Sequence, residues 1–274
     1  MKCPNRDNTI MTQGYRFAVL LCLCALSGLI AAESPSAAIS QPSTAPTKTT
    51  AIKIGAEDDW YPYSAKHNGQ PVGMAAEIVN AAFAAAKVNI QLVSLPYARC
   101  MSETSKAEIA GCFDTLRNPL NENLYLWHKT PLFPARILIY GPVNHTGKPL
   151  SVSDLTGKSV AITNGYDYGE AFDSDKTIKR DSGLMDINGL RKLAQGKVDY
   201  AVIYDRNALY LLKENPDITG KIKPVGVLIE PDIYLSFSKD YPNIQEIISQ
   251  FDRGLNHIKA NGDYQKILNK WQLD

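Results

Sequence analysis

From Ala51 onward, apolar residues repeat in the two periods that distinguish strands from helices. Residues 52–56 alternate between apolar and polar or small positions, which predicts a strand, and apolar residues then recur at helical spacing from Met74 to Ala86. Alternation returns at residues 88–92 and predicts a second strand. A strand, a helix and a second strand in succession form a βαβ unit, which implies a parallel sheet with right-handed crossovers.

A second set of patterns predicts a second lobe of the same kind. A short helix, a turn and an apolar strand follow one another at residues 99–117 and again at 187–206, and the strand at 198–204 is apolar enough to be buried on both faces. The chain passes out of the first lobe after residues 137–140 and returns through residues 228–235. We therefore expect an α/β protein in which lobe 1 comprises residues 51–140 and 234–274 and lobe 2 comprises residues 141–233.

The first 32 residues have the order of a secretory signal. Arg16 precedes an apolar run from Phe17 to Leu26, and small residues follow as far as Ala32. The run is short for a membrane-spanning helix, so we expect cleavage after Ala32; an uncleaved anchor is the alternative. Met11 is an alternative start. Lipid attachment at Cys22 or Cys24 is a weaker interpretation because a leucine precedes each of them.

An exported location affects the interpretation of residues 33–50 and of the cysteines. Ser, Ala, Pro and Thr dominate residues 33–50, which predicts a flexible tether. Cleavage leaves Cys100 and Cys112, and two cysteines in an oxidising compartment favour a disulfide, with two buried free thiols as the alternative. Such a bridge would close a short loop and stabilise the fold by about 2 to 3 kcal/mol.

Composition and charge exclude some functions. With 45% hydrophobic and 21% charged residues the chain is globular, and its formal charge of +1 is spread without a basic stripe. The electrostatic signature of a nucleic-acid-binding protein is therefore missing. The sequence contains no phosphate-binding loop and no nucleophile elbow, and its four histidines are widely separated, so we expect no metal and no cofactor.

Four segments resemble the extracellular solute-binding proteins of the polar amino-acid type (family 3), and the resemblance covers nearly the whole exported chain. They are YPYS at residues 61–64 with GQPVG at 69–73, DLTGKSV at 154–160, LAQGKVDYAVIYD at 193–205 and GDYQKILNKW at 262–271. The resemblance implies a periplasmic-binding-protein type II fold, whose two lobes close on a ligand by a hinge motion about the two crossovers.

The resemblance also implies a ligand site in the cleft, where loops at the carboxyl ends of strands meet. Trp60 matches an aromatic position that flanks the ligand, and Glu57 matches a position that contacts the ligand's side chain. Asp205 matches the acid that accepts hydrogen bonds from an α-amino group. A core tryptophan and a solvated glutamate are the alternatives for Trp60 and Glu57, whereas a carboxylate at the carboxyl end of a buried strand is a poor core residue, which favours ligand binding by Asp205.

Further contacts are expected from two loops. In the second lobe, Asn164, Gly165 and Tyr166 form a turn whose backbone N–H groups suit a carboxylate, with an ordinary Asn-Gly turn as the alternative. In the first lobe, Asp114 and Thr115 end a strand where the family supplies hydroxyl and backbone contacts.

One part of the family pattern is altered. Glu122 stands where the family has its carboxylate-binding arginine, in an ungapped comparison back from Thr130. Arg117 is positioned to take over that role, because a guanidinium pairs with a carboxylate through two hydrogen bonds, and Arg99 is a second basic residue near the cleft. The alternative is that both are surface charges. The α-carboxylate of the ligand is therefore an assumption.

We accordingly expect a monomeric periplasmic protein that binds a small polar ligand, with an amino acid as the leading class, and delivers it to an inner-membrane ABC permease. Two other functions remain open. Relatives of this scaffold include cleft dehydratases, for which Glu57 or Glu122 would serve as the acid. A ligand-reporting module for a membrane sensor is the other alternative.

Overall fold

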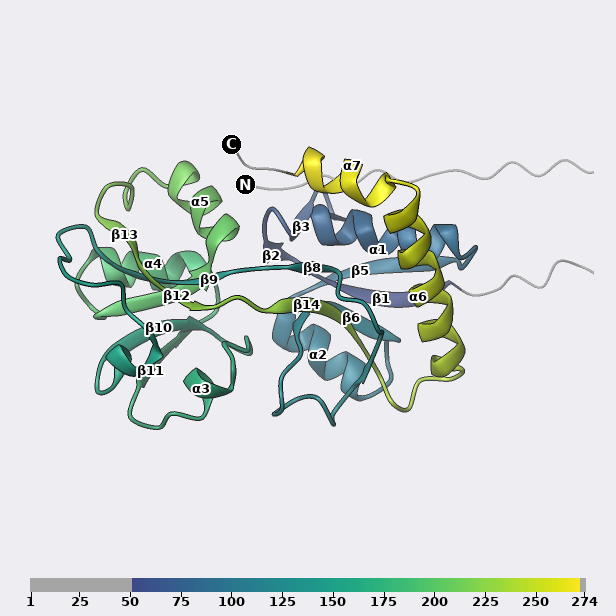
Figure 1. Ribbon diagram of the computed structural model, residues 1–274, viewed down its shortest axis with the longest axis horizontal. Helices are drawn as coiled ribbons and strands as arrows, with labels where there is room; N and C mark the ends of the chain where they lie inside the picture. The colour runs from purple at the N-terminus through teal and green to yellow at the C-terminus, as the bar shows by residue number, and fades with distance from the viewer. Residues whose placement is uncertain (1–50, 272–274) are drawn as a thin grey trace, which may run out of the picture. The chain divides into compact units, whose positions relative to one another are not determined.

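A computed structural model describes residues 51–271, and Figure 1 shows two lobes that each contain a β-sheet with helices against it. The predicted signal sequence at residues 1–32 and the tether at 33–50 lie outside the described residues. The residues of both lobes belong to one compact unit of the structure.

The first lobe is built on a sheet of order β5-β1-β6-β14-β7, with β8 also paired to β14. β1 is parallel to β5 and β6, and β14 is antiparallel to β6. Helix α1 connects β1 to β5, which confirms the βαβ unit. The elements are β1 (Ile52–Glu57), α1 (Met74–Ala85), β5 (Ile90–Leu95), α2 (Tyr97–Ser105), β6 (Gly111–Leu116), β7 (Leu126–Trp127), β8 (Phe133–Pro134), β14 (Asp232–Phe237), α6 (Ile244–Ala260) and α7 (Asp263–Lys270).

The second lobe is built on a sheet of order β11-β10-β12-β9-β13. β10 is parallel to β11 and β12, whereas β9 is antiparallel to β12 and β13. The elements are β9 (Ile137–Pro142), η1 (Val152–Leu155), β10 (Ser159–Thr163), α3 (Glu170–Asp173), β11 (Lys179–Gly183), α4 (Asp186–Ala194), β12 (Tyr200–Tyr204), α5 (Asp205–Glu214) and β13 (Ile222–Ile229).

Two adjacent connections join the lobes, one from β8 to β9 and one from β13 to β14. They are hydrogen-bonded to each other, because the Ala135 amide donates to the Pro231 carbonyl at 2.9 Å. The sequence-based boundary at residue 140 falls inside β9, which pairs along its length with strands of the second sheet. An apolar strand that is buried in one sheet cannot be distinguished by its pattern from one buried in the neighbouring sheet.

The segment after β1 contains structure that its polar pattern does not indicate. It forms an antiparallel three-stranded sheet of β2 (Asp59–Trp60), β3 (Ser64–His67) and β4 (Gln70–Val72). Its outer residues are exposed and polar, so the apolar alternation that marks a half-buried strand is missing. This small sheet leads into α1 and holds Asp59 and Trp60 beside the lobe boundary.

A disulfide joins Cys100 in α2 to Cys112 in β6, as the cysteine count predicted, with the Cα atoms 5.8 Å apart. Both cysteines are buried in a small cluster with Leu95, Tyr97 and Ile109. Gly55 of β1 is required here, because a Cβ at that position would lie 2.3 Å from the Cys100 sulfur. The bridge thus fixes α2 against β6 of the first sheet.

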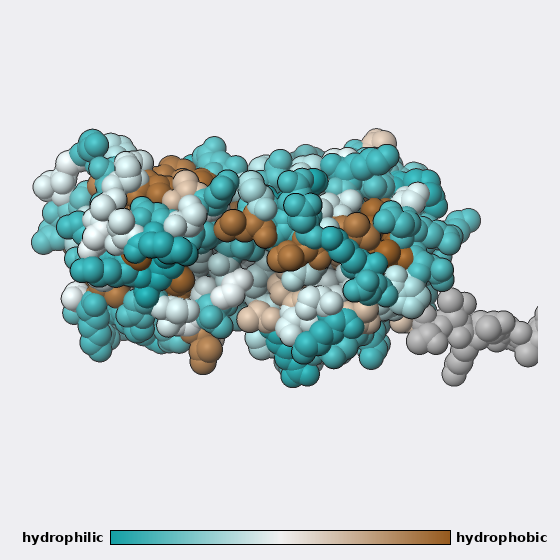
Figure 2. Space-filling model, turned by 90° about the horizontal axis from the view of Figure 1, so that it is seen from below, coloured by the Kyte–Doolittle hydropathy of each residue, from teal (hydrophilic) through white to brown (hydrophobic). Residues whose placement is uncertain are grey.

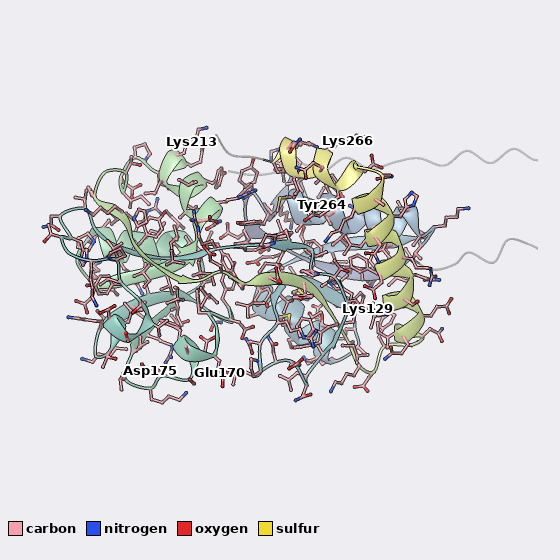
Figure 3. All side chains as sticks on the ribbon, viewed as in Figure 1. Lys129, Glu170, Asp175, Lys213, Tyr264 and Lys266 are labelled. Atoms are coloured by element: carbon pink, nitrogen blue, oxygen red, sulfur yellow. A yellow bond between two sulfur atoms is a disulfide. The ribbon has the colours of Figure 1, made fainter. Side chains whose placement is uncertain are left out.

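The surface of the described residues is mostly hydrophilic. On the face shown in Figure 2, hydrophobic residues form small separate patches. Lys213 and Lys266 point outward from the periphery in Figure 3, and the Tyr264 hydroxyl of α7 donates to the Leu132 carbonyl at 2.6 Å, which attaches α7 to the first lobe. Within residues 51–271 no helix is both long and apolar enough to cross a membrane.

Candidate functional site

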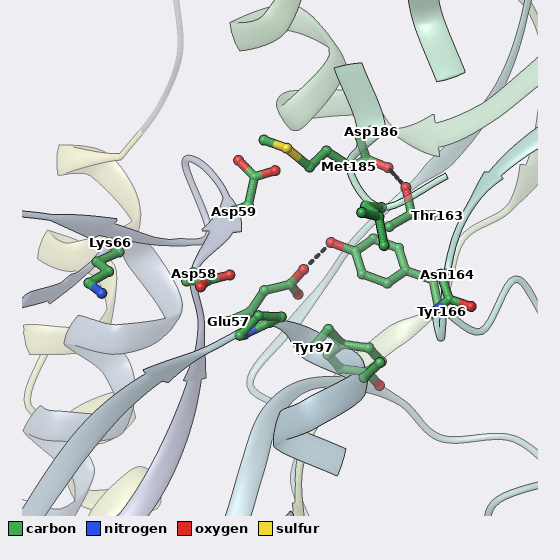
Figure 4. A pocket seen from close by; sticks show the side chains of 13 residues that line it. Glu57, Asp58, Asp59, Lys66, Tyr97, Thr163, Asn164, Tyr166, Met185 and Asp186 are labelled. Atoms are coloured by element: carbon green, nitrogen blue, oxygen red, sulfur yellow. Dashed lines mark hydrogen bonds between the residues drawn. The ribbon is translucent and has the colours of Figure 1, made fainter. Parts of the chain in front are cut away.

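A cavity of about 460 Å³ lies between the two lobes and is lined by side chains from both. Figure 4 shows that side chains from the end of β1 and the start of α2 face side chains from the loops after β10 and before α4. A cavity of this size suits a small molecule. It lies at the carboxyl ends of parallel strands, where open α/β sheets bind their ligands.

Glu57 and Tyr166 connect the two lobes across this cavity. Glu57 ends β1 and is only 4% exposed, and its carboxylate accepts a hydrogen bond from the Tyr166 hydroxyl of the second lobe. Burial, reinforced by the charge of Asp114, raises the pKa of Glu57 well above its ordinary value. The Tyr166 ring also packs edge-to-face on Tyr97, with the ring centroids 5.3 Å apart. These three residues form a polar and aromatic contact between the lobes.

The same three residues also line a smaller inner cavity of about 10 Å³, together with Trp60, Asp114, Leu116, Asp167 and Tyr204. Trp60 is stacked on Tyr63 at 4.1 Å between ring centroids and meets the edge of Tyr204 at 4.7 Å. Its indole N–H has no hydrogen-bond acceptor among the described residues. The lining of the inner cavity is therefore both aromatic and acidic.

Asp114 is a buried carboxylate without a hydrogen bond. It lies in β6 with a φ of +70° and is 5% exposed, and neither of its side-chain oxygens has a donor among residues 51–271. The nearby Ser64 hydroxyl donates its one hydrogen to the Glu57 carbonyl at 2.6 Å. Burial raises the pKa of Asp114 well above its ordinary value, against a smaller opposite effect of Ser64. Because buried polar groups are nearly always hydrogen-bonded, an unpaired carboxylate here is unusual.

Asp186 is the corresponding buried acid of the second lobe. It begins α4 and is 7% exposed; one oxygen accepts a hydrogen bond from the Thr163 hydroxyl, and the other has no partner in the described part of the chain. Burial raises its pKa from 3.8 to about 7, and the charge of Asp59 adds to the effect. Figure 4 places Asp59 and Met185 at the same side of the cavity as Asp186.

The charges around the two cavities are predominantly acidic. The acidic residues lining them are Glu57, Asp58, Asp59, Asp114, Asp167 and Asp186, and the basic lining residue is Lys66. Lys66 lies well to the side of the Glu57–Tyr166 contact in Figure 4. No histidine lines either cavity, and residues 51–271 contain no group of three or more His, Cys, Asp or Glu side chains that could hold a metal ion. The arrangement provides hydrogen-bond acceptors and aromatic faces, which suits recognition of a donor-rich ligand.

The structure brings about half of the predicted site residues together. Glu57, Asn164 and Tyr166 line the outer cavity, and Trp60 and Asp114 line the inner one. Gly165 is placed against the first lobe, since a Cβ on it would lie 2.9 Å from the Ala98 Cβ. In the same turn the Asn164 and Tyr166 amides donate to the backbone carbonyls of Gly183 and Thr163, at 2.8 and 3.3 Å. These two N–H groups are therefore already engaged within the second lobe.

Four of the predicted residues lie elsewhere. Thr115 is buried and lines neither cavity, and its hydroxyl donates to the Cys112 carbonyl at 3.1 Å. Arg99 is 69% exposed and pairs with Glu103 at 2.7 Å. Arg117 pairs with Glu122 beside the Trp127 ring and lines a different surface hollow.

Asp205 lies on the hinge side of the lobe boundary. Its carboxylate accepts hydrogen bonds from the Tyr63 hydroxyl and from Arg136 in the first connection, both at 3.2 Å. It begins α5 directly after β12, and its hollow is lined by hinge residues that are absent from the main cavity. Here Asp205 links the first lobe, the connection and the second lobe.

The sequence interpretation missed several lining residues. Asp58 and Asp59 extend Glu57 into an acidic run at the end of β1, a signal that was present in the sequence. Tyr97 and Asp186 are each the first residue of a helix. An acid at that position is usually explained by its stabilising effect on the helix, so its sequence position does not indicate a binding site. Only the meeting of the two lobes places these residues on one cavity.

The chain is similar to amino-acid-binding proteins and to a sensor domain. No family model matches it. A curated relative, the probable amino-acid-binding protein YxeM of Bacillus subtilis (strain 168), is 23% identical over 228 residues, which cover 80% of this chain and 83% of the relative.

Two solved structures share the fold. A histidine kinase sensor domain with similarity to periplasmic binding proteins superposes with a TM-score of 0.71 at 20% identity, covering 81% of this chain and 96% of the other. An ancestral arginine-binding protein bound to arginine gives a TM-score of 0.69 at 22% identity, covering 81% and 97%. The chain therefore has the two-lobed α/β fold of periplasmic binding proteins of type II, as expected from its sequence.

Proposed function

We propose that the chain is an exported solute-binding protein that captures a small polar ligand between its lobes and delivers it to a membrane permease. The observation that carries this proposal is the pair of adjoining cavities at the lobe boundary, where buried carboxylates of both lobes keep oxygens without hydrogen-bond partners among the described residues. A ligand that bonds to both lobes would favour their closed arrangement, since binding shifts the equilibrium toward the form that binds it best.

The cellular context rests on two further observations. The signal-like order of residues 1–32 supports a periplasmic location. The similarity to a probable amino-acid-binding protein supports amino acids as the first ligand class to examine. An ABC-type permease is the partner that this location and ligand class would require.

A sensor function is the second proposal, because one of the similar structures is a histidine kinase sensor domain. The same cleft would then report ligand occupancy to a membrane partner rather than release the ligand into a permease. The two functions share the binding site and differ in what recognises the closed form.

Binding is tested on the purified exported chain. Thermal-shift measurements across amino acids, amines and organic acids should give one ligand class whose stabilisation grows with concentration, and small-angle scattering should show a smaller radius of gyration with that ligand. Mass spectrometry should recover the ligand unchanged. A converted ligand would instead support a cleft enzyme of the dehydratase kind.

Transport and sensing are separated in cells. Deleting the gene should abolish uptake of the labelled ligand if the chain serves a permease. If uptake is unchanged and a ligand-dependent transcriptional response is lost, the sensor function replaces the transport function.

A further inference from the structure

The inner cavity contains a carboxylate that the protein leaves unpaired. Asp114 lines this cavity together with Glu57, Trp60 and Tyr204, and neither of its oxygens accepts a hydrogen bond from the described residues. A buried carboxylate without donors is destabilising relative to one that is hydrogen-bonded. A ligand with N–H donors at this point would supply the missing bonds.

The second lobe presents an acid in the same condition. Asp186 contributes one unpaired oxygen to the outer cavity, and Glu57 and Tyr166 line both cavities. Unpaired acceptors therefore belong to the lining residues of two cavities that share Glu57 and Tyr166, one acceptor on each lobe. A ligand with donors at two positions would join the lobes through them.

A carboxylate on the ligand has no comparable partner in the described residues around the cavities. Arg99 and Arg117 are engaged with Glu103 and Glu122 on the surface, and neither lines a cavity of the cleft. Lys66 is the basic lining residue and lies apart from the Glu57–Tyr166 contact (Figure 4). Burying a carboxylate among these acids would cost free energy through desolvation and like-charge repulsion.

The remaining lining favours a cation. The rings of Trp60, Tyr97, Tyr166 and Tyr204 surround the inner cavity, and aromatic faces attract ammonium and guanidinium groups when both are desolvated. Tyr166 already places a donor on Glu57, so its hydroxyl occupies the acceptor that a ligand's N–H group would take. Ligand binding would exchange this contact for a charge-assisted hydrogen bond, which is the stronger of the two kinds.

We propose that the cleft binds a small organic cation, an amine or a guanidine, and that recognition requires no carboxylate on the ligand. This inference rests on the proposed function and gives the ligand class of the same site. The cation bonds to Glu57 and Asp114 of the first lobe and to Asp186 of the second, and thereby holds the lobes together.

Matched pairs of ligands test the inference by calorimetry on the exported chain. Each pair has the same cationic group with and without the carboxylate: arginine and agmatine, lysine and cadaverine, ornithine and putrescine. We expect at least one amine to bind ten times or more tightly than its amino acid. Succinate, which carries carboxylates and no cationic group, should not bind.

The outcomes separate the inference from the proposed function. An amino acid that binds as tightly as its amine, or more tightly, overturns the inference and leaves the solute-binding function in place. An organic acid as the best ligand does the same. If no compound of any class binds or changes the scattering profile, the proposed function and the inference both fail.

Variants locate the binding acids. Asp114→Asn and Asp186→Asn keep the side-chain size and remove the charge, and each should weaken binding of the best amine at least tenfold. Asp240→Asn is the control, because Asp240 is exposed and lines neither cavity, so the affinity of this variant should stay within twofold of the parent. If Asp114→Asn does not fold, Glu57→Gln and Asp186→Asn decide the question. Unchanged affinity in both would overturn the inference.

Discussion

The acids on the cleft side of the lobe boundary and the acid on its hinge side have opposite environments. Asp114 and Asp186 are buried and keep oxygens without donors, whereas Asp205 is bound by Tyr63 and Arg136. Asp205 was the residue that the sequence marked most clearly for ligand binding. The position of an acid at the end of a strand therefore does not decide its role. The role is decided by the side chains that reach the acid from other elements.

The carboxylates on the cleft side are buried without a counter-charge, whereas the carboxylate on the hinge side has hydrogen-bond donors. Burial without a counter-charge raises the pKa values of Glu57, Asp114 and Asp186, in the last case to about 7. A site of this kind gains most from a ligand that brings positive charge. The hinge acid instead stabilises the connection about which the lobes would move.

The largest expected effect is on the pH dependence of stability. The pKa of Asp186 is raised in the folded protein from 3.8 to about 7. Asp186 therefore contributes to the stability of the fold below pH 3.8, and this contribution is lost as the pH rises to about 7. Asp186→Asn should therefore raise the free energy of unfolding at pH 8 by up to about 4 kcal/mol and change it little at low pH. Urea denaturation of both proteins across this range measures it, and Asp205→Asn serves as the hinge-side comparison. Parallel profiles for parent and Asp186→Asn would contradict the prediction.

Loss of the disulfide should have the next largest effect. The bridge from Cys100 to Cys112 fixes α2, which carries Tyr97, against β6, which carries Asp114. The double variant Cys100→Ala and Cys112→Ala should lose about 3 kcal/mol of stability in the chain-entropy model. Chemical denaturation with and without reductant measures this. Reductant should lower the stability of the parent only, and a response in the variant would point to another cause.

A smaller effect is expected where the lobes touch through the Asn-Gly turn. Gly165 has a φ of +83° and faces Ala98 of the first lobe, so an alanine there would both strain the turn and separate the lobes. Gly165→Ala should weaken ligand binding about tenfold, which corresponds to about 1.4 kcal/mol.

Gly220 provides the matched control for that change. Its φ is +76° and no atom lies within 4 Å of the position of a Cβ, so Gly220→Ala has the same backbone strain without the contact between lobes. It should lower stability and leave affinity unchanged in calorimetry. Equal losses of affinity in the two variants would mean that the turn does not mediate closure.

The smallest effect is expected on the hinge side. Tyr63→Phe removes the hydroxyl that donates to Asp205 at 3.2 Å and should cost about 1 kcal/mol of stability, as for a typical hydrogen bond. A double-mutant cycle with Asp205→Asn measures the coupling of the two groups. Affinity for the ligand should change much less than in the cleft variants. A larger loss of affinity than in Asp186→Asn would reverse the assignment of cleft and hinge.

The sequence predicted the fold better than it predicted the site. Periodicity identified β1 and α1, because their apolar positions repeat regularly. It missed β2 to β4, because these strands are short and polar and show no visible alternation. It also assigned β9 to the first lobe, although β9 pairs with strands of the second sheet.

The residue chemistry alone determined that this chain has two α/β lobes, a cysteine pair suited to bridging, and acids and aromatics at the ends of strands. Tertiary structure decided which of these residues share a cavity. Asp186, Tyr97 and Asp59 join Glu57 only when residues far apart in sequence meet across the lobe boundary, and Asp205 is taken by Tyr63 and Arg136 in the same way. The reason is that the charge and hydrogen bonding of a carboxylate depend on its burial and its hydrogen-bond partners. Both arise from the packing of elements against one another and cannot be inferred from a single position in the sequence.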